Sequence, residues 1–285
     1  MAVPVEISAW KPAPFALGGE TVFALGDVHG CAEELASLLD TVRTLAGESD
    51  RPRRLVFLGD LVDRGPDTLG VLRLWAEDAK TRGVDQVDRI IGNHEILMLL
   101  AMGHGQRAEK AAAMWLAERT GGSKVLAEMR AAVRDPMALP SYELATAALG
   151  RQVLDRLLTQ RSHLRLGNAV FVHGGLDGRV AQDTFLAPPW TAGTEARWAW
   201  ITTGFLDWQG GFGGTLVVHG HTPPHKHWPL THMEDPHLFL HDRLGLDGGS
   251  AITGIVAGAE IQDGRYRILK AGTQKSSSTA CRNGG

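Results

Sequence analysis

The sequence Gly26-Asp27-Val28-His29-Gly30 directly follows the apolar run Thr21-Val22-Phe23-Ala24-Leu25. A short run that is rich in Val and Phe and closed by glycine is typical of a buried strand. In an α/β sheet, the ends of such strands are where side chains from distant parts of the chain gather around a ligand. Asp27 and His29 therefore predict an α/β fold with a site at the ends of its strands.

Four further motifs are built in the same way. They are Gly59-Asp60-Leu61-Val62-Asp63-Arg64-Gly65, Gly92-Asn93-His94-Glu95, His173-Gly174-Gly175 and Gly220-His221-Thr222. Each follows a short apolar run. A single Asp after a strand is usually a turn or helix-cap residue, but five such motifs beside glycine predict one shared site.

The side chains of these motifs are typical metal ligands. They offer two carboxylates, one amide oxygen and three imidazoles, from Asp27, His29, Asp60, Asn93, His173 and His221. Without a thiolate the set excludes a structural zinc knuckle and favours a borderline-hard ion, with Mn²⁺ expected and Fe, Zn or Ni as alternatives. Six ligands predict two divalent ions about 3.5–4 Å apart, which generate a hydroxide nucleophile from water near neutral pH.

The motifs GDVHG, GDLVDRG, GNHE, HGG and GHT resemble the signature of the calcineurin-like metallophosphoesterases over residues 20–260. The full GDLVDRG and GNHE forms resemble the phosphoprotein (serine/threonine) phosphatase branch, bacterial type. The resemblance implies an α/β (α+β) four-layer sandwich of two mixed β-sheets flanked by helices. It further implies that Asp27 and His29 hold the first ion and that Asp60 bridges. Asn93, His173 and His221 would hold the second ion.

The resemblance also implies three catalytic residues. His94 would be the general acid, oriented by Asp63, while Arg64 grips the phosphoryl oxygens. The chemistry agrees, because a guanidinium clamps phosphate in bidentate fashion, and a neighbouring carboxylate favours the charged, proton-donating form of a histidine. Many bacterial members carry a second phosphate-binding arginine after a Trp-Ile pair, but here the stretch reads Trp200-Ile201-Thr202. Arg197 is the candidate substitute for substrate binding.

The ligand spacing predicts one large domain, because residues as distant as Asp27 and His221 must converge. We expect an extended lead-in over residues 1–19, a metallophosphoesterase domain over 20–272 and a disordered tail over 273–285. An Ala- and Leu-rich stretch at about 105–160 predicts a helical insertion. Within it, Trp115 and Gly121-Gly122-Ser123 resemble a segment that walls the substrate cleft in bacterial members, and a plain packing pair of helices is the alternative.

Composition is that of an intracellular globular enzyme. The 285 residues are 44% hydrophobic, and their net charge of −3 gives no basic footprint, so neither nucleic acid nor a membrane is an expected partner. The only two cysteines, Cys31 and Cys281, lie far apart, which argues against a disulfide framework and for the cytoplasm. The start of the chain has no signal-peptide pattern.

The first functional reading is therefore a metal-dependent phosphomonoesterase, specifically a serine/threonine protein phosphatase that uses in-line attack. The alternative is a symmetrical bis(5'-nucleosyl)-tetraphosphatase, which shares the centre and the fold. A third reading is a catalytically weakened protein that binds phospho-ligands, since one phosphate arginine is missing. The partner would be a phosphorylated protein or a small phosphoester. In the His-rich segment 219–241 only His221 has a motif. The others considered, His225, His227, His232 and His237, could form a loop rim, an adventitious metal patch or plain surface residues, and the surface interpretation is preferred. The natural substrate, the native metal and the oligomeric state stay open.

Overall fold

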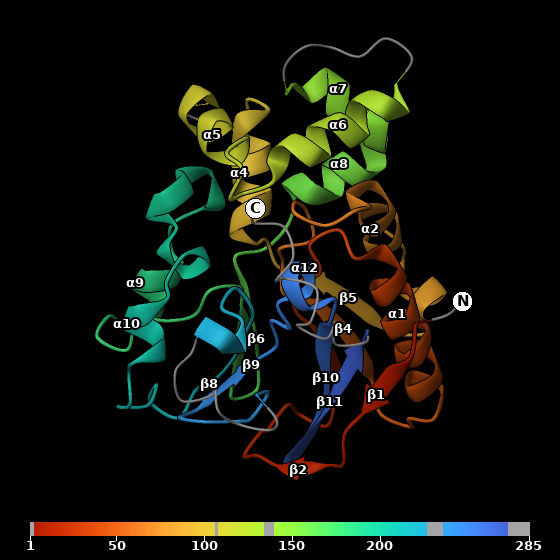
Figure 1. The fold of residues 1–285 in the computed structure, drawn as a ribbon. Coiled ribbons are helices and arrows are strands. Elements are labelled where there is room, and N and C mark those ends of the chain that lie inside the picture. The colour runs from red at the N-terminus through yellow and green to blue at the C-terminus, as the bar shows by residue number, and fades with distance from the viewer. Residues whose placement is uncertain (1–2, 106–107, 134–139, 227–235, 273–285) are drawn as a thin grey trace, which may run out of the picture.

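The computed structural model describes residues 3–105, 108–133, 140–226 and 236–272, so the predicted tail 273–285 lies outside the described residues. Two mixed β-sheets with helices on their outer sides form the architecture (Figure 1). This confirms the predicted fold class.

The larger sheet has seven strands. Strands β3 (Thr21–Leu25), β4 (Arg53–Phe57) and β5 (Gln86–Arg89) are parallel to one another. Strand β10 (Val256–Gln262) is antiparallel to both β3 and β11 (Arg265–Ala271). The order is β1-β11-β10-β3-β4-β5. Strands β1 (Val5–Ile7) and β2 (Lys11–Pro12) both pair with β11, so the lead-in residues extend this sheet at its edge.

The smaller sheet has the strand order β6-β7-β8-β9. Strand β6 (His163–Leu166) is antiparallel to β7 (Ala169–Val172), while β7, β8 (Leu216–His219) and β9 (Arg243–Gly245) are parallel. The strands that precede the motifs are thus parallel in both sheets. For this reason their carboxyl ends present the motif residues at the same edge.

Strands β3, β7 and β8 are buried on both faces, which explains their continuous apolar runs. Along β3, Val22 and Ala24 join a core cluster with Phe171 and Val218 of the second sheet, so this face fills the space between the sheets. Phe23 and Leu25 belong to a different cluster, which contains helix residues such as Leu35. The alternation of side chains along one strand therefore places a sheet–sheet layer on one face and a sheet–helix layer on the other.

Helices cover the outer faces and one end of the molecule. The larger sheet is flanked by α1 (Ala32–Gly47), α2 (Thr68–Trp75) and the short α3 (Ala79–Arg82). Helices α9 (Gln182–Leu186) and α10 (Thr203–Leu206) lie beside the smaller sheet, together with 3-10 turns at Trp190–Glu195 and Arg197–Ala199 (Figure 1). A further 3-10 turn, Pro224–Lys226, follows the motif Gly220-His221-Thr222. Helix α12 (Ser250–Thr253) follows strand β9.

The predicted helical insertion forms α5 (Ala108–Trp115), α6 (Gly122–Ala132), α7 (Tyr142–Leu149) and α8 (Arg151–Leu158). These helices group at one end of the molecule, where α5 packs on α4 (Asn93–Ala101) and α6 on α2 (Figure 1). Among the residues that the structure describes, no helix combines the length and apolar character needed to cross a membrane.

Candidate metal centre

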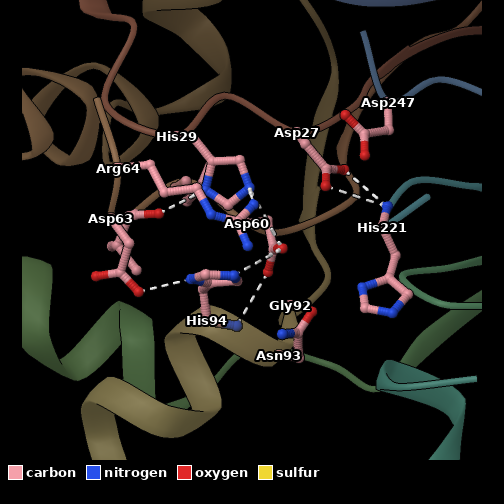
Figure 2. Close-up of polar contacts among 12 residues, drawn as sticks. Asp27, His29, Asp60, Asp63, Arg64, Gly92, Asn93, His94, His221 and Asp247 are labelled. Carbon is pink, nitrogen blue, oxygen red and sulfur yellow. Dashed lines mark hydrogen bonds and ion pairs between the residues drawn. The ribbon is translucent and has the colours of Figure 1, made fainter. Parts of the chain in front are cut away.

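The predicted ligands converge at the carboxyl ends of the strands, as Figure 2 shows for most of them. Two groups of possible metal-binding side chains stand out: His29 with Asp60 and His94, and Asp60 with His173 and His221. Within each group the ligand atoms lie within 4.8 Å of one another. Asp60 belongs to both groups, which is the arrangement that a carboxylate shared by two ions requires.

The other two predicted ligands adjoin the second group. Asn93 Oδ1 lies 3.0 Å from His173 Nε2. The Asp27 carboxylate belongs to neither group; it accepts hydrogen bonds from the backbone N–H of His221 at 3.0 and 3.1 Å. The structure therefore brings all six residues to one place, although it sets Asp27 beside His221 rather than in the group of His29.

Two imidazoles are held in the orientation that ligation needs. Nδ1 of His29 donates to the carbonyl oxygen of Val62, and Nδ1 of His173 donates to that of Leu58, each at 2.8 Å. This leaves both Nε2 atoms facing Asp60, at 3.6 Å from Oδ2 and 3.2 Å from Oδ1 respectively. Metal-binding histidines are commonly fixed in this way by a backbone carbonyl on the second nitrogen.

Backbone strain is concentrated at the same place. Of the seven non-glycine residues with positive φ in the described chain, five come from the motifs: His29, Asp60, Asp63, Arg64 and His221. Such conformations cost about 1–3 kcal/mol each and persist only where the surroundings enforce them. The surrounding packing therefore holds these side chains in one arrangement.

Two contacts bind the motif loops together. A Cβ on Gly65 would lie 1.8 Å from the carbonyl oxygen of His29, so only glycine lets the first two loops touch. Glu95 is fully buried, and its carboxylate accepts four backbone N–H groups, those of Asp60, Leu61, Val62 and Gly92, at 2.7–3.1 Å. It thus ties the start of α4 to the loop that carries the shared carboxylate.

The electrostatics of the cluster favour a bound cation. Burial, and then the nearby His94, lowers the pKa of His29 to about 3; burial and His173 lower the pKa of His221 to about 3. Both imidazoles are therefore neutral at pH 7, as ligands must be. Burial, followed by repulsion from Asp247 and Asp60, raises the pKa of Asp27 well above its usual range. A divalent ion relieves this repulsion between carboxylates.

His94 and Asp63 form a buried pair beside this cluster (Figure 2). Nδ1 of His94 donates to Asp63 Oδ2 at 2.6 Å, while Nε2 lies 3.9 Å from Asp60 Oδ2. The prediction that a neighbouring carboxylate would favour the charged imidazole is wrong for His94. Burial outweighs the attraction of Asp60 and lowers the pKa of His94 to about 4.

Arg64 and Arg197, the two predicted phosphate-binding arginines, lie in different surroundings. Arg64 lines the cavity over the motif residues, and its Nη1 donates to His29 Nε2 at 2.8 Å. Arg197 is not among the cavity-lining residues; its guanidinium donates to Asp177 at 3.1 Å and lies over the ring of Phe185. The structure thus places Arg197 in an ion pair away from the cavity, because a nearby carboxylate and an aromatic face hold it there.

The cavity over the motif residues has a volume of about 610 Å³. Besides Arg64 it is lined by two cations that the sequence did not single out, Arg119 from the turn after α5 and Lys226 from the turn Pro224–Lys226. Asp247 also lines it. The Asp247-Gly248-Gly249 sequence was an available signal, because a carboxylate beside two glycines is the pattern of the other motifs, whereas no motif marks Arg119 or Lys226.

The His-rich segment is only partly described, because His227 and His232 lie outside the described residues. His225 is exposed, as predicted, but His237 is buried and donates from Nδ1 to the carbonyl oxygen of Gly245 at 2.9 Å. The surface interpretation is therefore wrong for His237, because its contact with β9 covers it.

The family profile described as calcineurin-like phosphoesterase matches residues 20–245. The chain belongs to this family. Calcineurin-like phosphoesterases use a dinuclear divalent metal centre, and the two groups that share Asp60 supply its candidate ligands. Family membership thus places a calcineurin-like phosphoesterase domain over most of this chain.

Curated relatives of this phosphoesterase include symmetrical bis(5'-nucleosyl)-tetraphosphatases. The protein of Neisseria meningitidis serogroup A is 30% identical over 154 residues, which are 54% of this chain and 43% of the relative. That of Paracidovorax citrulli is 42% identical over 87 residues, 30% of this chain and 27% of the relative. The matches thus span less than half the length of these relatives.

Among solved structures, a protein serine/threonine phosphatase from Saccharomyces cerevisiae is similar, with a TM-score of 0.50 and 13% identity over 90% of this chain and 81% of the other. At this identity the likeness concerns the fold alone.

Proposed function

We propose that this chain hydrolyses symmetrical dinucleoside tetraphosphates with two divalent ions, Mn²⁺ being the expected metal. The observation that carries the proposal is the pair of ligand groups sharing Asp60 beneath a cavity that three cations line. The tetraphosphatase relatives support this substrate class better than a phosphoprotein. The first functional reading, a serine/threonine protein phosphatase, becomes the second candidate.

The residues present fit two ions. Asp27, His29, Asp60, Asn93, His173 and His221 would hold them, with Asp60 shared. When bound, such ions supply the nucleophile at neutral pH and neutralise charge on the phosphoryl oxygens. The neutral imidazoles of His29 and His221 and the crowded carboxylates described above are the chemistry on which this fit rests.

The chain's own residues would carry the proton and orient the phosphate. We assign His94 as the general acid, whose Nε2 gives a proton to the leaving oxygen while Nδ1 stays bound to Asp63. A negatively charged phosphate nearby favours the protonated imidazole and so counteracts the effect of burial. Arg64, at the edge of the cavity, would clamp the phosphoryl oxygens.

A polyphosphate chain requires several cations. Within the motifs the sequence offers only Arg64 as a phosphate-binding cation, and a single cation is an argument for a substrate with one phosphate, such as a phosphopeptide. The fold adds Arg119 and Lys226 to the same cavity, so three positive side chains face a substrate with four phosphates. These additional charges weaken that argument and favour the dinucleotide.

A rate panel with product analysis tests the proposal. The Mn²⁺-loaded protein is given diadenosine tetraphosphate, a phosphoserine peptide and 4-nitrophenyl phosphate, and the nucleotides released are separated by ion exchange. Symmetrical cleavage adds one water and releases two ADP, whereas asymmetrical cleavage releases ATP and AMP. We expect two ADP, with kcat/KM at least tenfold above that for the peptide. A tenfold preference for the peptide would assign the chain to the protein phosphatases.

A further inference from the structure

We infer that the helical insertion holds Asp63 and Arg64 in place, and that Trp115 is a positioning residue through which it orients the His94–Asp63 pair. This inference rests on the proposed function, since it assigns a role around the same general acid. It adds a polar contact with the catalytic pair to the two expectations for this segment, a cleft wall or plain packing.

The contact is a hydrogen bond to the far side of the Asp63 carboxylate. Nε1 of Trp115 donates to Oδ1 at 2.8 Å, while His94 Nδ1 donates to Oδ2 at 2.6 Å. Trp115 and Asp63 are both fully buried. Each oxygen of the carboxylate therefore has its own donor, and together the two donors fix the plane of the carboxylate and, through it, the imidazole ring.

The turn between α5 and α6 packs on the same stretch of backbone. Asp63 and Arg64 both have left-handed backbone conformations, with φ of 73° and 66°. Lys124 Nζ donates to the carbonyl oxygen of Arg64 at 2.9 Å. Non-glycine residues do not keep such conformations by themselves, so the insertion supplies contacts that hold them.

Two glycines make this close packing possible. A Cβ on Gly121 would lie 2.7 Å from the backbone nitrogen of Arg64, and a Cβ on Gly122 would lie 2.5 Å from Nε1 of Trp115. Larger residues would push the turn away from Arg64 and the indole away from Asp63. The Gly-Gly pair, Trp115 and Lys124 thus form one contact surface, which we call the insertion clamp.

Trp115→Phe tests the clamp, because phenylalanine keeps most of the ring and removes the donor. Trp75→Phe is the matched control: Trp75 is equally buried, in α2, and its Nε1 has no hydrogen-bond partner among the described residues. Both variants are loaded with Mn²⁺ and assayed with two esters. Phenyl phosphate has a phenolate leaving group that needs a proton, whereas the nitrophenolate of 4-nitrophenyl phosphate leaves without protonation. Metal content is measured alongside.

If Trp115 positions the acid, Trp115→Phe lowers kcat for phenyl phosphate by about 10- to 100-fold, part of the effect of a general acid. For the nitrophenyl ester the loss stays below about threefold, and metal content is unchanged. In a His94→Asn background, Trp115→Phe should cause no further loss. Equal losses for both esters, or losses no larger than those of Trp75→Phe, would overturn the inference.

Lys124→Ala provides a test that does not alter the core, since the Lys124 side chain is exposed. Loss of its bond to Arg64 should raise KM for both esters by about threefold, the scale of one modest hydrogen bond, without changing the ratio of their kcat values. An unchanged KM would show that the contact with Lys124 does not position Arg64 for substrate binding. Absence of hydrolysis of every phosphoester by the wild-type protein would instead contradict the proposed function, so the two failures are distinguishable.

Discussion

Replacing Glu95 by Gln should both destabilise the protein and loosen the loop that carries Asp60. The fully buried carboxylate receives two backbone N–H groups on each oxygen: Leu61 and Val62 on Oε1, Asp60 and Gly92 on Oε2. An amide keeps only one accepting oxygen and places an NH₂ donor where the other oxygen was. Two buried N–H groups therefore lose their acceptor in either orientation of the amide.

Each buried donor left without a partner costs about 1–3 kcal/mol, so Glu95→Gln should lower the free energy of unfolding by about 2–6 kcal/mol. We would measure urea unfolding of the metal-free protein at pH 8. Burial, followed by Asp60, raises the pKa of Glu95 to about 7, so the carboxylate is ionised at this pH. Glu33→Gln, at an exposed side chain in the first turn of α1, is the matched control and should have almost no effect.

A loss below about 1 kcal/mol in Glu95→Gln would refute the reasoning, because it would mean that the four N–H groups find other partners at little cost. The Mn²⁺ content of the same variant reports on the loop separately. We expect weaker retention of the ions, since the backbone of Asp60 loses its anchor even though every proposed ligand is still present.

Three further predictions concern the site. Asp60→Asn should abolish hydrolysis and reduce metal content in elemental analysis, since a neutral amide bridges two dications poorly; full metal content with retained activity would show that Asp60 is not shared. His94→Asn should lower kcat by about 10²- to 10⁴-fold with unchanged metal content and a smaller loss for nitrophenyl esters; an equal loss for all leaving groups would remove the acid role. Arg119→Ala should raise KM for diadenosine tetraphosphate by about tenfold, the scale of one charge-assisted hydrogen bond, whereas Arg197→Ala, which breaks the ion pair with Asp177, should leave KM within about twofold. A larger rise in KM for Arg197→Ala than for Arg119→Ala in steady-state assays would show that Arg197 is the second phosphate-binding arginine.

The sequence by itself determined the fold class and the candidate ligands, because the information for both is local. An apolar run closed by a glycine turn defines a buried strand and its end, and the five motifs place a carboxylate, amide or imidazole there. Their common position then follows from the parallel pairing of the strands, as in β3 with β4 and β7 with β8. The order of the strands and the participation of the lead-in residues in the larger sheet were not readable from these local patterns.

Only the tertiary structure decided which side chains surround the ligands. Trp115 meets Asp63 across 52 positions of sequence, and Arg119 and Lys226 reach the cavity from turns that carry no motif. Arg197, which sequence spacing favoured, pairs with Asp177 instead. The partner of a long charged side chain or an indole N–H group depends on which groups lie near it in space. The pKa of a group such as His94 depends on its burial. Neither spatial proximity nor burial can be read from the spacing of residues along the chain.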